Sequence, residues 1–261
     1  MRQILLAASL FIYLILTPGG AFSQPKSKEG QDKNVIKILT YNVRNCRGLD
    51  NKTDYQRIAD IINKIDPDVV ALQEIDSSTL RSGKIVVLSE LAIRTNLYAT
   101  FGASISYQGG KYGIGILSKE KPARWESTAL PGREESRSLL IVEFKDYIFC
   151  STHFSLNEED RLKSVEIINS LFNSYKKPVF LAGDLNADPG SDVIKNLKPG
   201  WLILNNIAEP TIPADNPRRC IDYILALKSK IYGYIVEESV VEAEAVASDH
   251  LPVWARVRIE N

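Results

Sequence analysis

The sequence has 261 residues, of which 44% are hydrophobic and 25% charged, as in ordinary globular proteins and unlike disordered or fibrous ones. Lysine plus arginine and aspartate plus glutamate both number 32, so the formal net charge is zero. This balance excludes a globally basic nucleic-acid-binding protein, although a local basic groove stays compatible with it.

The N-terminus has the pattern of a secretory signal peptide. Arg2 precedes an apolar run over residues 4–16, and small residues follow at Ala21 and Ser23. The run is shorter than the roughly 20 residues that span a bilayer. We expect cleavage of residues 1–23 after Ser23, a flexible tail over residues 24–34, and a secreted or periplasmic protein without stable membrane insertion. An uncleaved anchor is the alternative.

If the protein is exported, its three cysteines, Cys46, Cys150 and Cys220, are in an oxidising compartment. Three thiols cannot all pair within one chain. Cys150 lies in an apolar run and is interpreted as a packed core residue. A disulfide between Cys46 and Cys220 is compatible with the sequence, but their spacing does not support it.

Apolar runs and helical patterns fill residues 35–261, which we interpret as one domain. Helices are predicted at residues 53–65, with Thr53 and Asp54 as start signals, at residues 85–93, and from Asn157 along an apolar stripe to Phe172. Strands are predicted at residues 35–43, 68–73, 98–105, 114–117, 137–144, 147–154, from 178, and at 201–204, 220–226, 234–241 and 252–259. This order predicts an α/β domain of stacked layers.

Polar residues recur at the ends of these strands. Strands end at Asn42, Glu74, His153, and Asp184 with Asn186, while Asp222 lies in the strand from Cys220 and Asp249 and His250 immediately precede the last strand. Ligands of open α/β sheets gather at one edge of the strands, so we expect these side chains to converge. The only two histidines of the chain belong to the set, which favours function over a structural role. Taken singly, Asn42, Asp184 and Asp222 are also compatible with turn or capping residues.

Six motifs resemble, in order, the endonuclease/exonuclease/phosphatase superfamily, which includes DNase I-like nucleases, neutral sphingomyelinases and inositol polyphosphate 5-phosphatases. They lie at residues 40–44 (TYNVR), 72–74 (LQE), 152–154 (THF), 183–186 (GDLN), 221–223 (IDY) and 248–250 (SDH). The resemblance spans residues 35–259. It implies an α/β (α+β) four-layer sandwich of two packed, mostly antiparallel β-sheets flanked by helices. It also implies phosphoester hydrolysis by water with a divalent metal, usually Mg²⁺, with Mn²⁺ or Ca²⁺ as alternatives.

The same resemblance assigns the metal and the water. Glu74 would be the principal metal ligand, with Asn42 beside it, and Asp249 would support the metal or the nearby histidine. Asp184 would orient or deprotonate the attacking water, and Asn186 would help to place it against the phosphate. These side chains offer oxygen atoms, which Mg²⁺ prefers to thiolates.

The resemblance also assigns the phosphate contacts. His250, held by Asp222, would bind the phosphate in the transition state, and His153 would contact another phosphoryl oxygen. Pairing with a carboxylate would raise the pKa of His250 and keep it cationic. Tyr112, in a glycine-rich segment similar to one in secreted relatives, and Arg137, at a strand start, are predicted substrate contacts. A flexible hairpin loop and an ordinary salt bridge are the alternatives for these two.

The substrate is less constrained by the sequence. The proline-rich segment at residues 209–219 would shape the substrate mouth or serve as a rigid connector. Basic residues form no long run, which favours a small-molecule phosphodiester or phosphomonoester, or a lipid head group, over long DNA. Nucleic acid is possible but not favoured, so a secreted DNase I-like endonuclease is the alternative. A third interpretation is a non-catalytic binding module on the same fold. The sequence does not indicate an oligomeric state.

Overall fold

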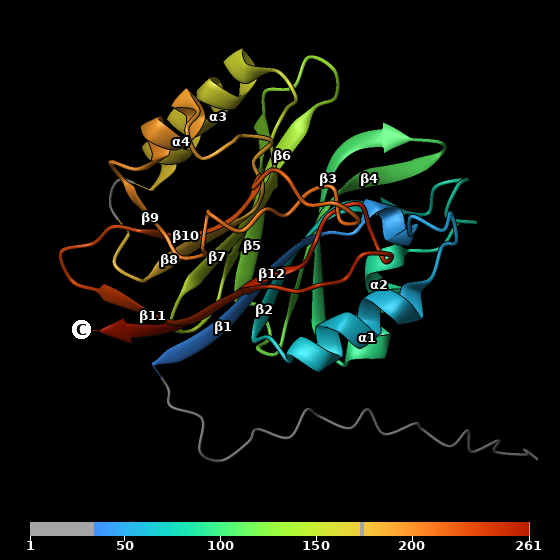
Figure 1. The fold of residues 1–261 in the computed structure, drawn as a ribbon, viewed down its shortest axis with the longest axis horizontal. Helices are drawn as coiled ribbons and strands as arrows, with labels where there is room; N and C mark the ends of the chain where they lie inside the picture. Colours follow the sequence, from blue (N-terminus) through green and yellow to red (C-terminus); the bar gives the residue numbers. More distant parts are fainter. Residues whose placement is uncertain (1–33, 173–174, 261) are drawn as a thin grey trace, which may run out of the picture.

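The computed structural model describes residues 34–172 and 175–260, so the predicted signal peptide and nearly all of the predicted tail lie outside the described residues. Two six-stranded sheets form the centre of the molecule (Figure 1). The first sheet contains β1 (Val35–Asn42), β2 (Val69–Ser77), β3 (Tyr98–Tyr107), β4 (Gly110–Ser118), β11 (Gly233–Val241) and β12 (Val253–Glu260). Its strand order is β11-β12-β1-β2-β4-β3.

The second sheet has the order β5-β6-β7-β8-β10-β9. Its strands are β5 (Arg124–Leu130), β6 (Arg137–Glu143), β7 (Ile148–His153), β8 (Val179–Asp184), β9 (Trp201–Ile203) and β10 (Asp222–Leu227). Helices α1 (Tyr55–Ile65) and α2 (Val87–Thr95) cover the first sheet, and α3 (Glu158–Leu171) and α4 (Asp192–Leu197) cover the second (Figure 1). The predicted four-layer sandwich is confirmed. No described helix has the length and apolar character needed to cross a membrane.

Apolar side chains bind the layers together. Phe149 and Phe180 of the second sheet share one buried cluster with Ile38 of the first. On the outer faces, Ile58 of α1 packs against the first sheet and Ile168 of α3 packs against the second. Each fully buried side chain of this size stabilises the fold by roughly 1.5–3 kcal/mol. Because several such side chains lie between the two sheets, they hold the sheets in one packing arrangement.

Each sheet contains one parallel pair of strands, and all its other pairs are antiparallel. β1 pairs with β2 and β7 pairs with β8 in parallel, and the connections contain α1 and α3. Parallel neighbours have their carboxyl ends at the same edge of the sheet. Asn42 therefore lies beside Gln73, and His153 lies beside Asp184, which in turn pairs with Asp222 of β10.

The predicted elements are present, with some differences. Asp54 and Asn157 cap α1 and α3 as expected, because their side chains accept hydrogen bonds from the backbone of the first turn. The strand predicted at residues 68–73 continues to Ser77. The sequence did not predict β5, α4 or the short 3-10 turn Arg44–Cys46. β5 is an exposed edge strand without apolar alternation, so it lacks the signal of a buried strand.

The three cysteines are buried and form no disulfide, and Cys150 is a core residue as predicted. Cys46 packs between the first sheet and its helices, whereas Cys220 packs with the second sheet. Burial raises the pKa of the Cys220 thiol to about 12 and that of Cys46 further.

We therefore expect the native protein to resist Ellman's reagent at mildly alkaline pH, because the thiols are covered and protonated. Three thiols should react once guanidinium unfolds the chain without reductant. A count of one thiol after unfolding would reveal a disulfide and contradict this structure.

Candidate active site

Glu74 reaches the site through a bulge in β2. The pairing of β2 with β4 slips between Leu72 and Ile75, and Glu74 has a φ of 61°, in the left-handed region that residues other than glycine rarely adopt. The sequence placed Glu74 at the exit of a strand, which is wrong, because β2 continues on both sides of it. A bulge re-aims a side chain without ending the strand, and here it turns Glu74 toward the strand ends.

Asn42 joins the two sheets. Its amide Nδ2 donates to Glu74 Oε1 at 3.2 Å and to Asp184 Oδ2 at 3.1 Å, and its Oδ1 accepts from the backbone N–H of Arg44 at 3.1 Å. Asn42 is 1% exposed, and its contact with Asp184 is fully buried, whereas its contact with Glu74 is partly buried. One amide therefore sets the separation of two predicted functional carboxylates from different sheets.

Asp184 faces both histidines. Its Oδ2 lies 3.4 Å from His153 Nε2 and 3.6 Å from His250 Nε2, while its Oδ1 accepts from the backbone N–H of Asn186 at 2.9 Å. Burial lowers the pKa of His153 to about 4, more than the Asp184 carboxylate raises it. His153 is therefore neutral near pH 7. Its Nδ1 faces the guanidinium of Arg137 at 3.4 Å, which places the proton on Nε2.

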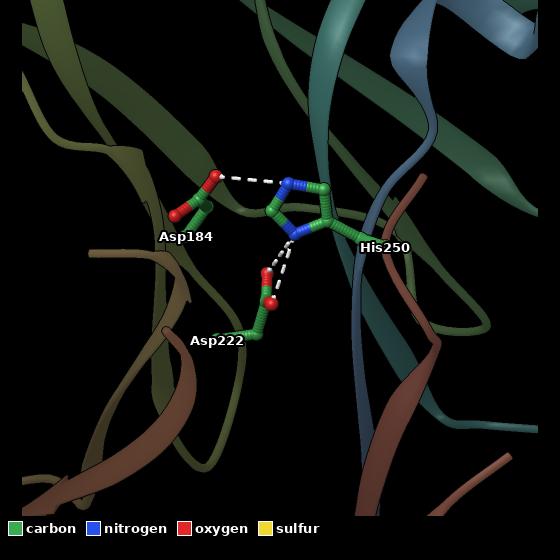
Figure 2. A group of neighbouring side chains, drawn as sticks. All are labelled: Asp184, Asp222 and His250. Atoms are coloured by element: carbon green, nitrogen blue, oxygen red, sulfur yellow. Dashed lines mark hydrogen bonds and ion pairs between the residues drawn. The ribbon is translucent and has the colours of Figure 1, made fainter. Parts of the chain in front are cut away.

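His250 is a cation, in contrast to His153. Its Nδ1 lies 3.0 and 3.2 Å from the two oxygens of Asp222, and its Nε2 points toward Asp184 (Figure 2). Burial opposes protonation, but the carboxylates of Asp222 and Asp184 outweigh it and raise the pKa of His250 to about 10. Asp222, the first residue of β10, also accepts a 2.5 Å hydrogen bond from Thr211 Oγ1.

The donor set fits a divalent cation. Burial raises the pKa of Glu74, the Asn42 amide lowers it, and the nearby carboxylates of Asp249 and Asp184 raise it again, with an upward net shift. Carboxylates gathered in this partly buried corner repel one another unless a cation neutralises them. Their oxygen atoms suit Mg²⁺.

Ligand atoms of Asp184, Asp222 and His250 also lie within 4.8 Å of one another, close enough to hold a metal. In this second group, however, His250 is already bound to Asp222 and carries a proton on each nitrogen. The corner at Glu74 therefore fits a cation better.

Asn186 and Asp249 lie at the edge of the same centre. Asn186 Nδ2 donates to the backbone carbonyl of Phe154 at 3.0 Å, which leaves its Oδ1 for other contacts. Asp249 Oδ2 lies 3.7 Å from Arg44 Nε. Both are partly exposed, as is Glu74, whereas Asp184 and the two histidines are buried.

The two predicted substrate contacts differ in their surroundings. Tyr112 is 8% exposed, and its ring lies under the guanidinium of Arg81, whose Cζ is 5.1 Å from the ring centroid. Burial and the neighbouring Glu74 raise the pKa of Tyr112, so its phenol keeps its proton. Arg137 is 6% exposed and binds Glu134, Glu135 and His153. It touches the site through His153, and its contact with a substrate stays a prediction.

Sequence reasoning missed two supports of the site. Thr211 lies eleven residues before the Asp222 that it binds, and a lone threonine in a proline-rich loop carries no signal. Arg81 is held by the buried carboxylate of Asp76 through contacts of 2.7 and 3.1 Å. Its place over Tyr112 follows from the tertiary fold alone.

The structure thus brings Asn42, Glu74, His153, Asp184, Asn186, Asp222, Asp249 and His250 to the joined ends of two sheets. A centre of carboxylates, one cationic and one neutral imidazole, and oxygen donors for a cation defines a phosphoric ester hydrolase. Residues 39–250 match the Endonuclease/Exonuclease/phosphatase family, and the chain belongs to this family. Its members are phosphoesterases and nucleases that generally depend on a divalent metal.

Solved structures agree with the fold. An endonuclease/exonuclease/phosphatase from Beutenbergia cavernae DSM 12333 has a TM-score of 0.73 and 22% identity, over 88% of this chain and 72% of that chain. The mannosyl-6-phosphatase of Bacteroides thetaiotaomicron VPI-5482 has a TM-score of 0.62 and 17% identity, over 87% and 100%. The human Nocturnin catalytic domain with bound sulfate has a TM-score of 0.67 and 16% identity, over 87% and 94%. Comparison with curated protein sequences gives no match.

The two histidines can be told apart by NMR. In metal-free protein we expect the His250 ring to titrate near pH 10 and the His153 ring near pH 4. Because the folded pKa of His250 is raised, the stability from its pairing is complete below the unfolded value of about 6.5 and is lost as pH rises through about 10.

The variant Asp222→Asn should lower the pKa of His250 and leave His153 almost unchanged, because Asp222 is bonded to His250 alone of the two. Imidazole ¹⁵N shifts report both rings, and the chain has no other histidine. Titration of both rings near 6.5 would contradict the described geometry.

Proposed function

We propose that the protein is an exported, Mg²⁺-dependent phosphoesterase that hydrolyses a small phosphodiester or phosphomonoester, or a lipid head group. The observation that carries this proposal is the meeting of Asp184 with both imidazoles beside the half-buried Glu74 carboxylate. Export rests on the signal-peptide pattern of residues 1–23, and N-terminal sequencing of the mature protein tests it.

Glu74 and Asp249 would hold the cation, with Mn²⁺ or Ca²⁺ as alternatives to Mg²⁺. Asn42 keeps Glu74 in place by its amide donor and fixes its distance from Asp184. A bound divalent cation would supply positive charge to the phosphoryl oxygens as they gain negative charge.

Asp184 would orient the attacking water and accept its proton. Its buried carboxylate is held by Asn42 and by the backbone of Asn186, so little reorganisation is needed. Asn186 Oδ1, which is free of the Phe154 contact, would help to position the water. The reaction adds water across the P–O ester bond and yields an alcohol and a phosphate.

The two imidazoles would bind the phosphoryl group. His250 would offer a charged Nε2–H and His153 a neutral one, and both now point at Asp184 Oδ2. Asp222 holds His250 in its charged form, because its carboxylate sits on the other ring nitrogen. A charge-assisted donor is roughly twice as strong as a neutral one, so His250 should contribute more to transition-state binding.

The charges around the site favour a small substrate. Arg44, Arg81, Arg137 and Arg219 are each paired with a carboxylate. A protein that tracks a long nucleic acid needs cations free for several phosphates. This pairing supports the small-ester reading over a DNase-like one.

Purified protein should hydrolyse bis-p-nitrophenyl phosphate or p-nitrophenyl phosphate with Mg²⁺, lose activity in EDTA and regain it when Mg²⁺ returns. Asp184→Asn should lower kcat at least about 100-fold, because the proton acceptor is lost. Asp192→Asn, on the exposed face of α4, is the matched control. Rapid nicking of plasmid DNA without small-ester turnover would support the endonuclease instead.

Glu74→Gln should raise the Mg²⁺ concentration for half-maximal activity at least about tenfold, because the amide removes a charged oxygen ligand. The Mg²⁺-dependent rise in melting temperature should shrink in parallel. Glu166→Gln, an exposed residue of α3, should behave as wild type. Equal Mg²⁺ dependence of Glu74→Gln and wild type would refute the ligand assignment.

A further inference from the structure

A cavity of about 290 Å³ opens between the loops that follow β8 and precede β10. Its lining comprises Asp188, Pro189, Ile207, Ala208, Pro210, Pro217, Arg218, Arg219 and Cys220. None of the proposed catalytic residues lines it. The cavity is therefore a separate space whose walls continue from the catalytic strands.

The cavity lies next to the reacting centre. Asp188 comes two residues after Asn186, and Cys220 comes two residues before Asp222. β8 and β10 pair Asp184 with Asp222, so both loops leave the sheet at the same edge. The hydrogen bond to Asp188 is the main cause that raises the pKa of Arg219. The Asp184 carboxylate adds a smaller contribution in the same direction, so Arg219 lies near Asp184. A group attached to a phosphate at Asp184 can therefore extend into this cavity.

The main polar feature of the cavity is a salt bridge between Arg219 and Asp188. Arg219 Nε and Nη2 donate to Asp188 Oδ1 and Oδ2, both at 3.0 Å, in a bidentate pair that joins the two loops. Arg218 lies beside it, and its guanidinium has no ion pair among the described residues. The rest of the lining is proline, aliphatic side chains and the Cys220 thiol.

A bidentate arginine–aspartate pair has unused donors beside unused acceptors. One hydroxyl of a vicinal diol can accept from the guanidinium while its neighbour donates to the carboxylate. The aliphatic wall suits the C–H face of a sugar ring. A nucleobase is a poorer fit, because the lining contains no aromatic side chain for stacking.

We propose that this cavity is the leaving-group subsite of the enzyme and that it binds a polyhydroxylated group, so that the substrates are sugar phosphates. The inference rests on the proposed phosphoesterase function and names its substrate class. Asp188 and Arg219 bind adjacent hydroxyls, and Arg218 binds a further oxygen at the rim.

Binding is tested first, without turnover. In EDTA, saturation-transfer NMR should show contacts from the protein to the ring protons of mannose 6-phosphate. The signal should fall at least about tenfold in Asp188→Asn, which keeps the shape of the side chain but removes its charge. An equal signal for phenyl phosphate, or an unchanged signal in Asp188→Asn, would overturn the subsite.

Kinetics then tests specificity. With Mg²⁺, kcat/KM for mannose 6-phosphate should exceed that for p-nitrophenyl phosphate, and Arg219→Lys should lower this ratio about tenfold through KM, because lysine cannot form the bidentate pair. Arg124→Lys, an exposed pair on β5, should leave the ratio unchanged.

The two proposals fail in different ways. Turnover of nitrophenyl esters without a preference for the sugar phosphate, and without an effect of Arg219→Lys on the ratio, would remove the subsite and keep the phosphoesterase. Absence of turnover for every ester would remove the phosphoesterase, while the NMR contacts would still decide the sugar site.

Discussion

Two polar bridges across the interface between the sheets determine whether the catalytic centre exists. Asn42 of β1 contacts Asp184 of β8, and His250, which precedes β12, contacts Asp222 of β10. Each bridge joins the first sheet, or the loop that leads into it, to the second sheet. The apolar packing between the sheets therefore does more than stabilise the fold, because without it neither contact can form.

The bridges also explain the charge states of the centre. Buried carboxylates are costly unless something positive faces them. His250 supplies one positive charge between Asp184 and Asp222. The half-buried Glu74 has no such partner at short range, and the partly exposed Asp249 has Arg44 3.7 Å away, so this corner would accept a divalent cation. The two histidines differ because burial, with a smaller contribution from Arg137, lowers the pKa of His153, whereas Asp222 and Asp184 outweigh burial at His250.

Local patterns predicted most of the fold, because strands buried on both faces read as continuous apolar runs and helix caps have clear residue preferences. Polar residues at strand ends predicted the convergence of the site. The bulge at Glu74, the hydrogen bond from Thr211 and the burial of Arg137 were not predicted. Each depends on partners far away in the sequence, and spacing carries no information about them.

In the proposed reaction, both imidazoles and a cation at Glu74 act on one phosphoryl group. A crystal soaked with Mn²⁺ and phosphate tests it most directly, through the anomalous signal of the metal. We predict a manganese peak at Glu74 and Asp249, with phosphate oxygens within hydrogen-bond distance of His153 Nε2 and His250 Nε2. A peak held by Asp222 and His250, or phosphate bound away from both imidazoles, would contradict the account.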